Sequence, residues 1–301
     1  MSSSLVELVK TRIDYYSRFF VLTELTKQLK FKYLSVRRLN PKKDKKYILA
    51  RYYQGYSLDT LKNSLSRNNV LKDSSAKIYF DLATYKNNSN MTPIFSFDKK
   101  ERSEQKKLFS GNPKDNNGEY LKLINSYDFV IDIDSKNLKT AWKDTKQIKE
   151  VFDKYKLPYS LRFSGSKGFH FVIDSKFINL PYNPIELPNI FGKVVQELGK
   201  EIFGIDKEDN PEGNIDFSIY DARRVLKLAY SLCNNMGEEY VCLPLNDKQF
   251  NNWKYEDMKL LRVMECIKIS NRGLLERDFG LTESQLKSNF VKFIGDYYTD
   301  G

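Results

Sequence analysis

The sequence predicts an α/β (α+β) fold in which helices flank a sheet. In the central third of the chain, apolar runs of strand length alternate with an amphipathic helical pattern, in the order strand, helix, strand, tight turn, strand. Both ends of the chain instead space their apolar side chains at helical intervals. With 301 residues, 41% of them hydrophobic, the chain is long enough to bury a large core in one large or two coupled domains.

Helices and a basic segment are expected before the central third. Apolar residues at three- and four-residue steps predict one long or two short helices between residues 4 and 33. Residues 35–57 interleave lysine and arginine with tyrosine. Such a mixture can follow a phosphate backbone and stack bases, or it can form a solvated loop beside partly buried tyrosines. The alternation of apolar and polar residues predicts a strand over residues 77–85. The polar residues 98–119 are expected to form a surface loop.

The elements of the central third follow from their apolar periodicity. A buried run that stops on two carboxylates begins this region, and an amphipathic helix that ends before Pro158 comes next. Two short strands then enclose a glycine-containing turn, and a second helix precedes a last strand. The predicted strands cover residues 127–134, 159–163, 169–173 and 214–220, and the predicted helices cover residues 138–155 and 187–202.

Helical patterns return after residue 245. Thr282 and Gln285 have the spacing of a capping box ahead of a further apolar helical pattern. We therefore expect one domain over residues 1–245 and an appended helical segment over residues 246–301. Within the domain, residues 1–80 form a helical and basic N-terminal part, and residues 120–245 form the core that bears the motifs.

Composition and charge restrict the class of partner. The chain has 50 lysines and arginines against 39 acidic residues, a net charge of +11 that favours polyanions such as nucleic acid, although a lysine-rich surface alone would give the same balance. Three cysteines without a C-x-x-C motif and a single histidine do not suit a structural zinc site. No apolar run approaches the ~18 residues that span a bilayer, and no signal-peptide pattern opens the chain. A soluble, cytoplasmic protein is expected, without membrane partners.

Three carboxylates are the candidate metal ligands. Asp132 and Asp134 are two residues apart on a predicted strand, so both point to the same face of the sheet. Asp216 lies on a later predicted strand. Together the three side chains can hold two Mg²⁺ or Mn²⁺ ions, an arrangement that stabilises the entering and leaving oxygens in phosphoryl transfer. The alternative is a solvated acidic pair in which Asp134 caps the helix that follows.

The turn at residues 164–168 is the candidate phosphate site. It reads Ser-Gly-Ser-Lys-Gly and is followed by Phe-His-Phe, which contains the only histidine, His170. The glycines let backbone N–H groups approach a triphosphate, Ser164 and Ser166 can donate hydroxyl groups, and Lys167 supplies a point charge. If the phenylalanines on both sides of His170 face the core, the imidazole faces the other side, beside the basic turn. This alternation favours a ligand-binding histidine over a core histidine.

These residues resemble the three motifs of the archaeo-eukaryotic primase superfamily, in the same order. The motifs are Asp132-Ile-Asp134, the turn through His170, and the segment from Asn214 to Leu232, within residues 120–245. The resemblance implies a primase-type catalytic core with an RRM-like mixed or antiparallel sheet flanked by helices, plus N- and C-terminal helical segments. It assigns catalysis and metal binding to Asp132, Asp134 and Asp216. It assigns nucleotide binding to Ser164, Gly165, Ser166, Lys167, His170 and Lys227, with Arg162 and Arg224 as neighbours.

The resemblance also implies an activity. A DNA-directed primase-polymerase would use two Mg²⁺ or Mn²⁺ ions to transfer nucleotides from NTPs or dNTPs, making primers de novo, extending DNA or RNA primers, or doing both. Its partners would be single-stranded or primed DNA, with a helicase or other replication, repair or CRISPR-adaptation proteins as possible further partners. The turn is also similar to Ser-Gly-Gly-Lys-Gly-Leu-His of the polymerase domains of bacterial end-joining ligases, so a gap-filling polymerase is an alternative. A metal-dependent nuclease and an inactive single-strand-binding module are the others.

Two departures from the primase pattern are visible. Primase catalytic subunits usually carry a histidine where this chain has Cys233, so one phosphate contact would shift to Asn234 or Lys227. They also commonly carry a zinc-binding cluster between the second and third motifs, whereas residues 174–213 contain neither cysteine nor histidine, and no zinc is expected. A compact, zinc-free primase-polymerase of a bacterial, plasmid or CRISPR-associated type would accommodate both likenesses, to the primase catalytic subunit and to the end-joining polymerase domains.

Overall fold

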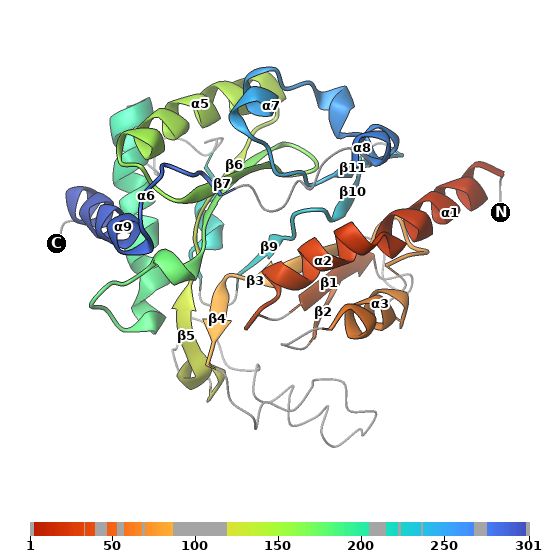
Figure 1. Cartoon of the computed structure of the whole chain (residues 1–301), viewed down its shortest axis with the longest axis horizontal. Coiled ribbons are helices and arrows are strands. Elements are labelled where there is room, and N and C mark those ends of the chain that lie inside the picture. Colours follow the sequence, from red (N-terminus) through yellow and green to blue (C-terminus); the bar gives the residue numbers. More distant parts are fainter. Residues whose placement is uncertain are drawn as a thin grey trace. The chain divides into compact units, whose positions relative to one another are not determined.

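The computed structural model confirms the predicted fold class, with helices around several antiparallel sheets (Figure 1). It divides into two compact units, neither of which is one continuous segment. Unit 1 comprises Met1–Asp81, Asn87–Lys107 and Val225–Leu274, and unit 2 comprises Leu82–Lys86, Leu108–Arg224 and Leu275–Gly301. The residues that the structure describes are 3–32, 34–39, 47–52, 57–67, 70–86, 119–204, 215–221, 224–235, 237–267 and 276–298.

Unit 1 is built on a four-stranded antiparallel sheet with the order β2-β1-β3-β9. Its strands are β1 (Leu34–Leu39), β2 (Tyr47–Tyr52), β3 (Lys77–Asp81) and β9 (Val225–Lys227). A separate hairpin pairs β10 (Leu232–Asn235) with β11 (Glu238–Val241). Strands that are about 145 residues apart in the sequence, β3 and β9, therefore lie side by side in a single sheet.

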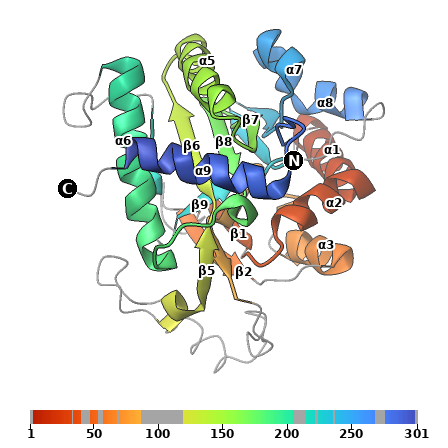
Figure 2. The same cartoon turned by 60° about the vertical axis from the view of Figure 1, so that its left-hand side comes forward.

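The N-terminal helical region of unit 1 consists of two helices, the second of the two arrangements that its periodicity allowed. They separate at Arg18, where ψ is 128° and the backbone is extended. Figure 2 shows α1 and α2 grouped with α3. The helices of this unit are α1 (Ser3–Ser17), α2 (Phe19–Gln28), α3 (Leu58–Arg67), α7 (Asp247–Asn251) and α8 (Leu260–Ile267), with the 3₁₀ helix η6 (Tyr255–Met258) before α8.

The single strand expected over residues 77–85 is two strands. Strand β3 pairs within the sheet of unit 1, whereas β4 (Ala83–Tyr85) pairs with β5 (Ile124–Tyr127) in unit 2. The chain changes sheets at Leu82, whose N–H donates to the carbonyl of Arg224 and whose carbonyl accepts from the N–H of Asp128. These two bonds replace ladder bonds at Leu82, and the alternation of apolar residues continues across the break.

Unit 2 carries three of the four strands that the central third predicts. They form an antiparallel sheet in the order β6 (Phe129–Asp134), β8 (Gly168–Ile173), β7 (Tyr159–Phe163). Helix α5 (Leu138–Lys154) lies between β6 and β7 in the chain, and α6 (Leu187–Phe203) follows β8. The N-terminal cap of α5 is Asn137, whose side chain accepts from the N–H of Lys139 at 2.9 Å, so Asp134 is left for another role. Short 3₁₀ helices are η2 (Glu119–Leu123), η3 (Ser175–Phe177), η4 (Pro184–Glu186) and η5 (Phe217–Ile219).

Helix α9 (Glu283–Tyr297) completes the core of unit 2. The predicted capping box is present, with Thr282 and Gln285 bonding each other's backbone N–H groups. In Figure 2, α9 lies across β6 and β8, and its Phe293 ring lies 5.8 Å from that of Phe129 on β6. The expected boundary at residue 245 does not coincide with a unit boundary, because Val225–Leu274 belongs to unit 1 and Leu275–Gly301 to unit 2.

Some predictions fall on residues that the structure does not describe. Residues 98–118 of the expected loop, and residues 40–46 and 53–56 of the basic segment with tyrosines, lie outside the described ranges. Among the described helices, none has the length and apolar character required to cross a membrane.

Candidate active site

A row of three polar side chains crosses the sheet of unit 2. Asp132 on β6 is the direct partner of His170 on β8, and His170 is in turn the partner of Arg162 on β7. Direct cross-strand partners place their side chains on the same face of a sheet. The imidazole Nε2 lies 3.3 Å from Asp132 Oδ1. His170 and Arg162 are buried, whereas the side chain of Asp132 is 16% exposed.

Asp216 lies next to Asp132 through the backbone. Its N–H donates to the carbonyl of Asp132 at 2.9 Å, and Ile215 forms a bridge with Ile133. The strand expected over residues 214–220 is wrong beyond this point, because the Asp216 carboxylate accepts from the N–H of Ser218 at 2.8 Å and caps η5. Aspartate side chains compete with strand ladders through such local bonds. The third predicted carboxylate residue is thus placed beside the first.

Tyr220 is a part of this site that sequence reasoning missed. Its hydroxyl donates to the carbonyl of Val130 at 2.7 Å. Burial raises the pKa of Tyr220 well above its usual value, and the negative charges of Asp132 and Asp216 raise it further. A Cβ at Gly192 of α6 would lie 3.2 Å from the Cβ of Tyr220, so the glycine makes room for the ring. The sequence signal would have been a tyrosine four residues after Asp216, which is too common to single out.

The turn between β7 and β8 is closed by its own backbone and by Ser164. The N–H of Ser164 donates to the carbonyl of Gly168 at 2.9 Å, and Ser164 Oγ accepts from the N–H of Gly168 at 3.1 Å. Gly165 has a φ of 83°, in the left-handed region that favours glycine. Ser164 is buried, Ser166 is half-buried and Lys167 is exposed. Lys167 therefore presents its charge to solvent while Ser164 shapes the turn.

Gly168 fixes this turn against the strand that carries the carboxylates. It is the partner of Asp134, and a Cβ at this position would lie 1.6 Å from the carbonyl oxygen of Ile133. The N–H of Ser135 also donates to the carbonyl of Lys167 at 3.3 Å. No residue with a side chain fits at Gly168, so the glycine brings the end of β6 and the turn together.

The remaining predicted residues are distributed between the units. Arg224 belongs to unit 2 and is exposed. Lys227 lies in unit 1, on β9 opposite Tyr79, and Cys233 is buried on β10 of the same unit. Asn234 is also in unit 1, where its side-chain oxygen accepts from the N–H of Gly237 at 3.3 Å. Unit 2 thus holds every predicted site residue except Lys227. Cys233, which stands where primases usually carry a second histidine, and Asn234, the substitute contact, also lie in unit 1.

The donor types suit Mg²⁺ or Mn²⁺, since carboxylate oxygens are the ligands that these ions prefer. In the structure, however, Asp132 Oδ1 faces His170, and Asp216 Oδ1 accepts from Ser218. Within the described part of the chain, no three acidic, histidine or cysteine side chains form a group that could hold a metal ion. The backbones of Asp132 and Asp216 are adjacent, but their carboxylates are turned toward groups of the protein.

Comparison with known sequences gives one partial match. The sequence matches no family model. Over 116 residues it is 32% identical to an uncharacterized protein of Methanocaldococcus jannaschii, which corresponds to 36% of this chain and 25% of that protein. The match therefore spans about a quarter of the relative's length.

Comparison with solved structures is more informative. The polymerase domain of Ligase D from Mycobacterium tuberculosis, solved in complex with DNA, has a TM-score of 0.53 at 12% identity, over 84% of this chain and 87% of that domain. The primase RepB′ gives a TM-score of 0.39 at 8% identity, over 92% and 68% of the two chains. The first likeness is one of fold. The chain therefore has the fold of that polymerase domain.

Proposed function

We propose that this chain is a primase-polymerase that transfers nucleotides to a growing strand on a DNA template. The observation that carries the proposal is the row Asp132, His170 and Arg162 across three strands, with Asp216 bonded to Asp132 through the backbone. Acidic residues suited to metal ions thus lie beside groups suited to phosphates. The fold similarity to a polymerase domain solved with DNA and the net charge of +11 support a nucleic-acid substrate.

The carboxylates would hold the divalent ions. When bound between Asp132, Asp134 and Asp216, two Mg²⁺ or Mn²⁺ ions would lower the pKa of the attacking 3′-hydroxyl and stabilise the leaving pyrophosphate. The contacts with His170 and Ser218 both involve Oδ1, so Oδ2 of Asp132 and of Asp216 would be the ligand atoms. Asp134 is exposed at the end of β6 and would complete the site.

The positive groups would hold the triphosphate. Arg162 keeps its charge at any physiological pH, and its burial beside His170 strengthens its effect on a nearby anion. Lys167 extends from the turn, and the N–H groups around Gly165 and Ser166 can approach phosphate oxygens. Arg224 and Lys227 are the further proposed contacts. Such fixed positive groups stabilise charge that develops on the phosphates during transfer.

Primer synthesis tests the proposal directly. The protein is incubated with unprimed and primed single-stranded DNA, Mg²⁺ or Mn²⁺, and labelled NTPs or dNTPs. Asp132→Asn should reduce incorporation by at least about 100-fold, because metal-held carboxylates contribute several kcal/mol to such reactions. Asp296→Asn, an exposed position on α9, is the matched control and should retain activity. Full activity of Asp132→Asn would contradict the assignment.

A second variant separates nucleotide binding from catalysis. His170→Ala should mainly raise the KM for the nucleotide and weaken nucleotide binding, because the imidazole lies between Asp132 and Arg162, next to the proposed phosphate contacts. Equal nucleotide affinity of this variant and the parent would mean that the histidine is structural. Degradation of a labelled strand without added nucleotide would favour the nuclease alternative. Strand binding without any incorporation would favour the inactive binding module.

A further inference from the structure

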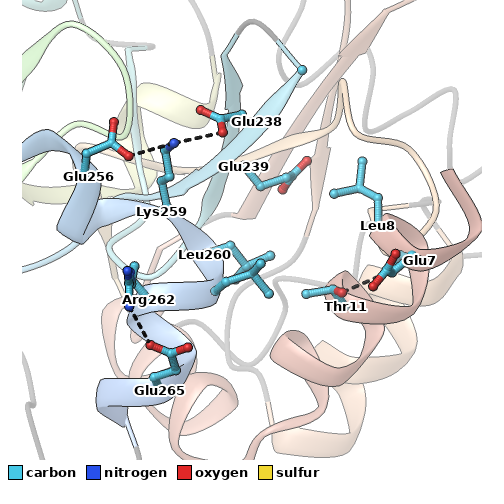
Figure 3. A pocket seen from close by; sticks show the side chains of 12 residues that line it. Glu7, Leu8, Thr11, Glu238, Glu239, Glu256, Lys259, Leu260, Arg262 and Glu265 are labelled. Carbon is cyan, nitrogen blue, oxygen red and sulfur yellow. Dashed lines mark hydrogen bonds and ion pairs between the residues drawn. The ribbon is translucent and has the colours of Figure 1, made fainter. Parts of the chain in front are cut away.

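Unit 1 contains a pocket of about 660 Å³ that none of the predicted site residues lines. It lies between α1 and α8, with β11 and η6 contributing further walls (Figure 3). We call it the acidic pocket, and its lining residues are Glu7, Leu8, Thr11, Gly237, Glu238, Glu239, Glu256, Lys259, Leu260, Leu261, Arg262 and Glu265. A volume of this size can accept several side chains of a ligand.

The charge of the acidic pocket is opposite to that of the whole chain. Five glutamates and two basic residues line it, in a protein with a net charge of +11. The two basic residues are already paired, since Lys259 Nζ lies 2.9 Å from Glu238 and 2.7 Å from Glu256, and Arg262 bonds Glu265 at 3.3 Å (Figure 3). Because Glu238 and Glu256 share one lysine and Glu7 adds a further negative charge, the pocket keeps a small excess of negative charge that favours cations over phosphates.

On the opposite wall, Glu7 supplies an exposed negative charge. It makes no ion pair among the contacts of the described residues, and its carbonyl accepts a bond from the Thr11 hydroxyl at 2.9 Å. Glu239 differs, because it is buried in an ion pair with Arg12 and belongs to the core. Glu7 is thus the glutamate best placed to meet a charged partner.

Apolar side chains accompany these charges. Leu261 of α8 is 65% exposed, and Val6, next to the pocket residue Glu7 on α1, is 54% exposed. Leu8 of α1 is half-buried and also lines the pocket, and Figure 3 shows it on the opposite side of the pocket from the buried Leu260. A small inorganic cation would leave these apolar surfaces uncovered. A ligand that covers them must carry apolar groups together with positive charge.

We propose that the acidic pocket docks a segment of a partner protein that combines apolar side chains with lysine or arginine, in the manner of an amphipathic helix laid into a groove. The apolar side chains of the partner would cover Leu261 and Leu8. Its basic residues would face Glu7 and the glutamates of the rim, which gives the interaction its specificity. The proposal concerns unit 1 and does not depend on the proposed nucleotidyl transfer.

Two synthetic peptides provide the probe. Both have about 15 residues, or roughly four helical turns, with leucines at i, i+4, i+7 and i+11. One carries lysine at the other exposed positions and the second carries glutamate. Fluorescence anisotropy with the full-length protein should give a micromolar Kd for the lysine peptide and a Kd at least about tenfold weaker for the glutamate peptide, since opposite and like charges differ by more than about 1.4 kcal/mol.

Variants of the protein locate the binding. Leu261→Ser and Glu7→Lys should each weaken the binding of the lysine peptide by about fivefold to tenfold. Both substitutions are at exposed positions and should leave the fold intact. The matched controls Val291→Ser on α9 and Glu150→Lys on α5 are also exposed and should leave the Kd unchanged. In addition, Glu7→Lys should bind the glutamate peptide more tightly than the parent does.

Three results would overturn the proposal. The first is a lysine peptide that does not bind below about 1 mM, which corresponds to only about 4 kcal/mol of binding free energy. The second is an equal effect of the pocket variants and the control variants. The third is a loss of affinity for a labelled single-stranded DNA oligonucleotide in Leu261→Ser, which would identify the surface as part of a nucleic-acid site.

Discussion

The position of Gly168 decides whether the carboxylate strand and the phosphate turn can lie together. A Cβ there would lie 1.6 Å from the Ile133 carbonyl oxygen, and backbone cannot move aside as the end of a side chain can. Gly168→Ala should therefore destabilise the protein by about 3 kcal/mol, the upper part of the range for overpacking. Urea unfolding followed by circular dichroism measures this difference.

Gly295 on α9 is the control for this prediction. A Cβ there meets nothing within 4 Å, and the residue lies in the interior of a helix. Gly295→Ala should stabilise the protein by up to about 1 kcal/mol, the difference in helix propensity. Similar shifts in the two variants would mean that the close approach at Gly168 is not what holds the strands together.

A second residue-scale prediction concerns Arg12 and Glu239 of unit 1. Both are buried, and Arg12 also donates to the carbonyl of Val70 at 2.6 Å. Burial raises the pKa of Glu239, and the guanidinium of Arg12 opposes that rise. Glu239→Gln leaves a buried guanidinium without its counter-charge and should cost about 3 to 5 kcal/mol in unfolding free energy.

An exposed ion pair serves as the comparison for Glu239. Arg262 and Glu265 are 68% and 67% exposed in their side chains. Glu265→Gln should change the unfolding free energy by less than about 1 kcal/mol, because water screens such a pair. If Glu239→Gln changed the unfolding free energy as little as Glu265→Gln, the buried pair would contribute little to the stability of unit 1.

At the scale of elements, α9 contributes its aromatic residues to the core of unit 2. The Phe293 ring lies within 6 Å of the rings of Phe129, Phe152, Tyr155 and Tyr297. Phe293→Ala should destabilise the protein by about 3 to 5 kcal/mol, the usual cost of removing a buried aromatic ring. Thermal and urea unfolding check this value.

The neighbouring position Val291 supplies the control for α9. It is 40% exposed on the same helix. Val291→Ala should change the unfolding free energy by less than about 0.5 kcal/mol, as is usual for surface substitutions. Equal effects of the two substitutions would show that α9 does not complete the core.

The elements around the site could be predicted wherever a single spacing of apolar residues, that of a strand or that of a helix, continued along the whole element. Strands β6, β7 and β8 and helices α5 and α6 follow from their apolar patterns and from the turn and proline signals between them. The prediction of a strand over residues 214–220 failed because the Asp216 side chain caps a short 3₁₀ helix instead. The prediction of a single strand over residues 77–85 failed because the alternation of apolar and polar residues does not show which sheet each half joins.

Side-chain neighbours in the site were harder to predict. Alternation along β8 placed His170 on the face opposite Phe169, but only the strand register sets Arg162 and Asp132 on either side of it. Register depends on the geometry of the turn, which the sequence shows only through its glycines. Tyr220 had no distinguishing pattern, since it joins the site through long-range contacts.

At the scale of the whole molecule, each unit is assembled from segments that are distant in the sequence. The last strand of the unit 1 sheet, β9, comes after residue 224, and α9 comes from the end of the chain. The domain boundary expected at residue 245 rested on a change in local pattern. Local pattern does not show which core a later helix enters, because that depends on contacts between residues far apart in the sequence.

This assembly predicts that a fragment ending at Leu245 will not fold. It lacks buried residues of both units, Leu260 and Val263 from unit 1 and Phe290 and Phe293 from unit 2. Each missing apolar side chain removes about 1.5 to 3 kcal/mol of burial, against a typical total stability of about 5 to 15 kcal/mol. The full chain should show a cooperative urea transition, and the fragment should show none. A cooperative transition in the fragment would mean that residues 1–245 form a self-sufficient domain to which the last helices are only appended.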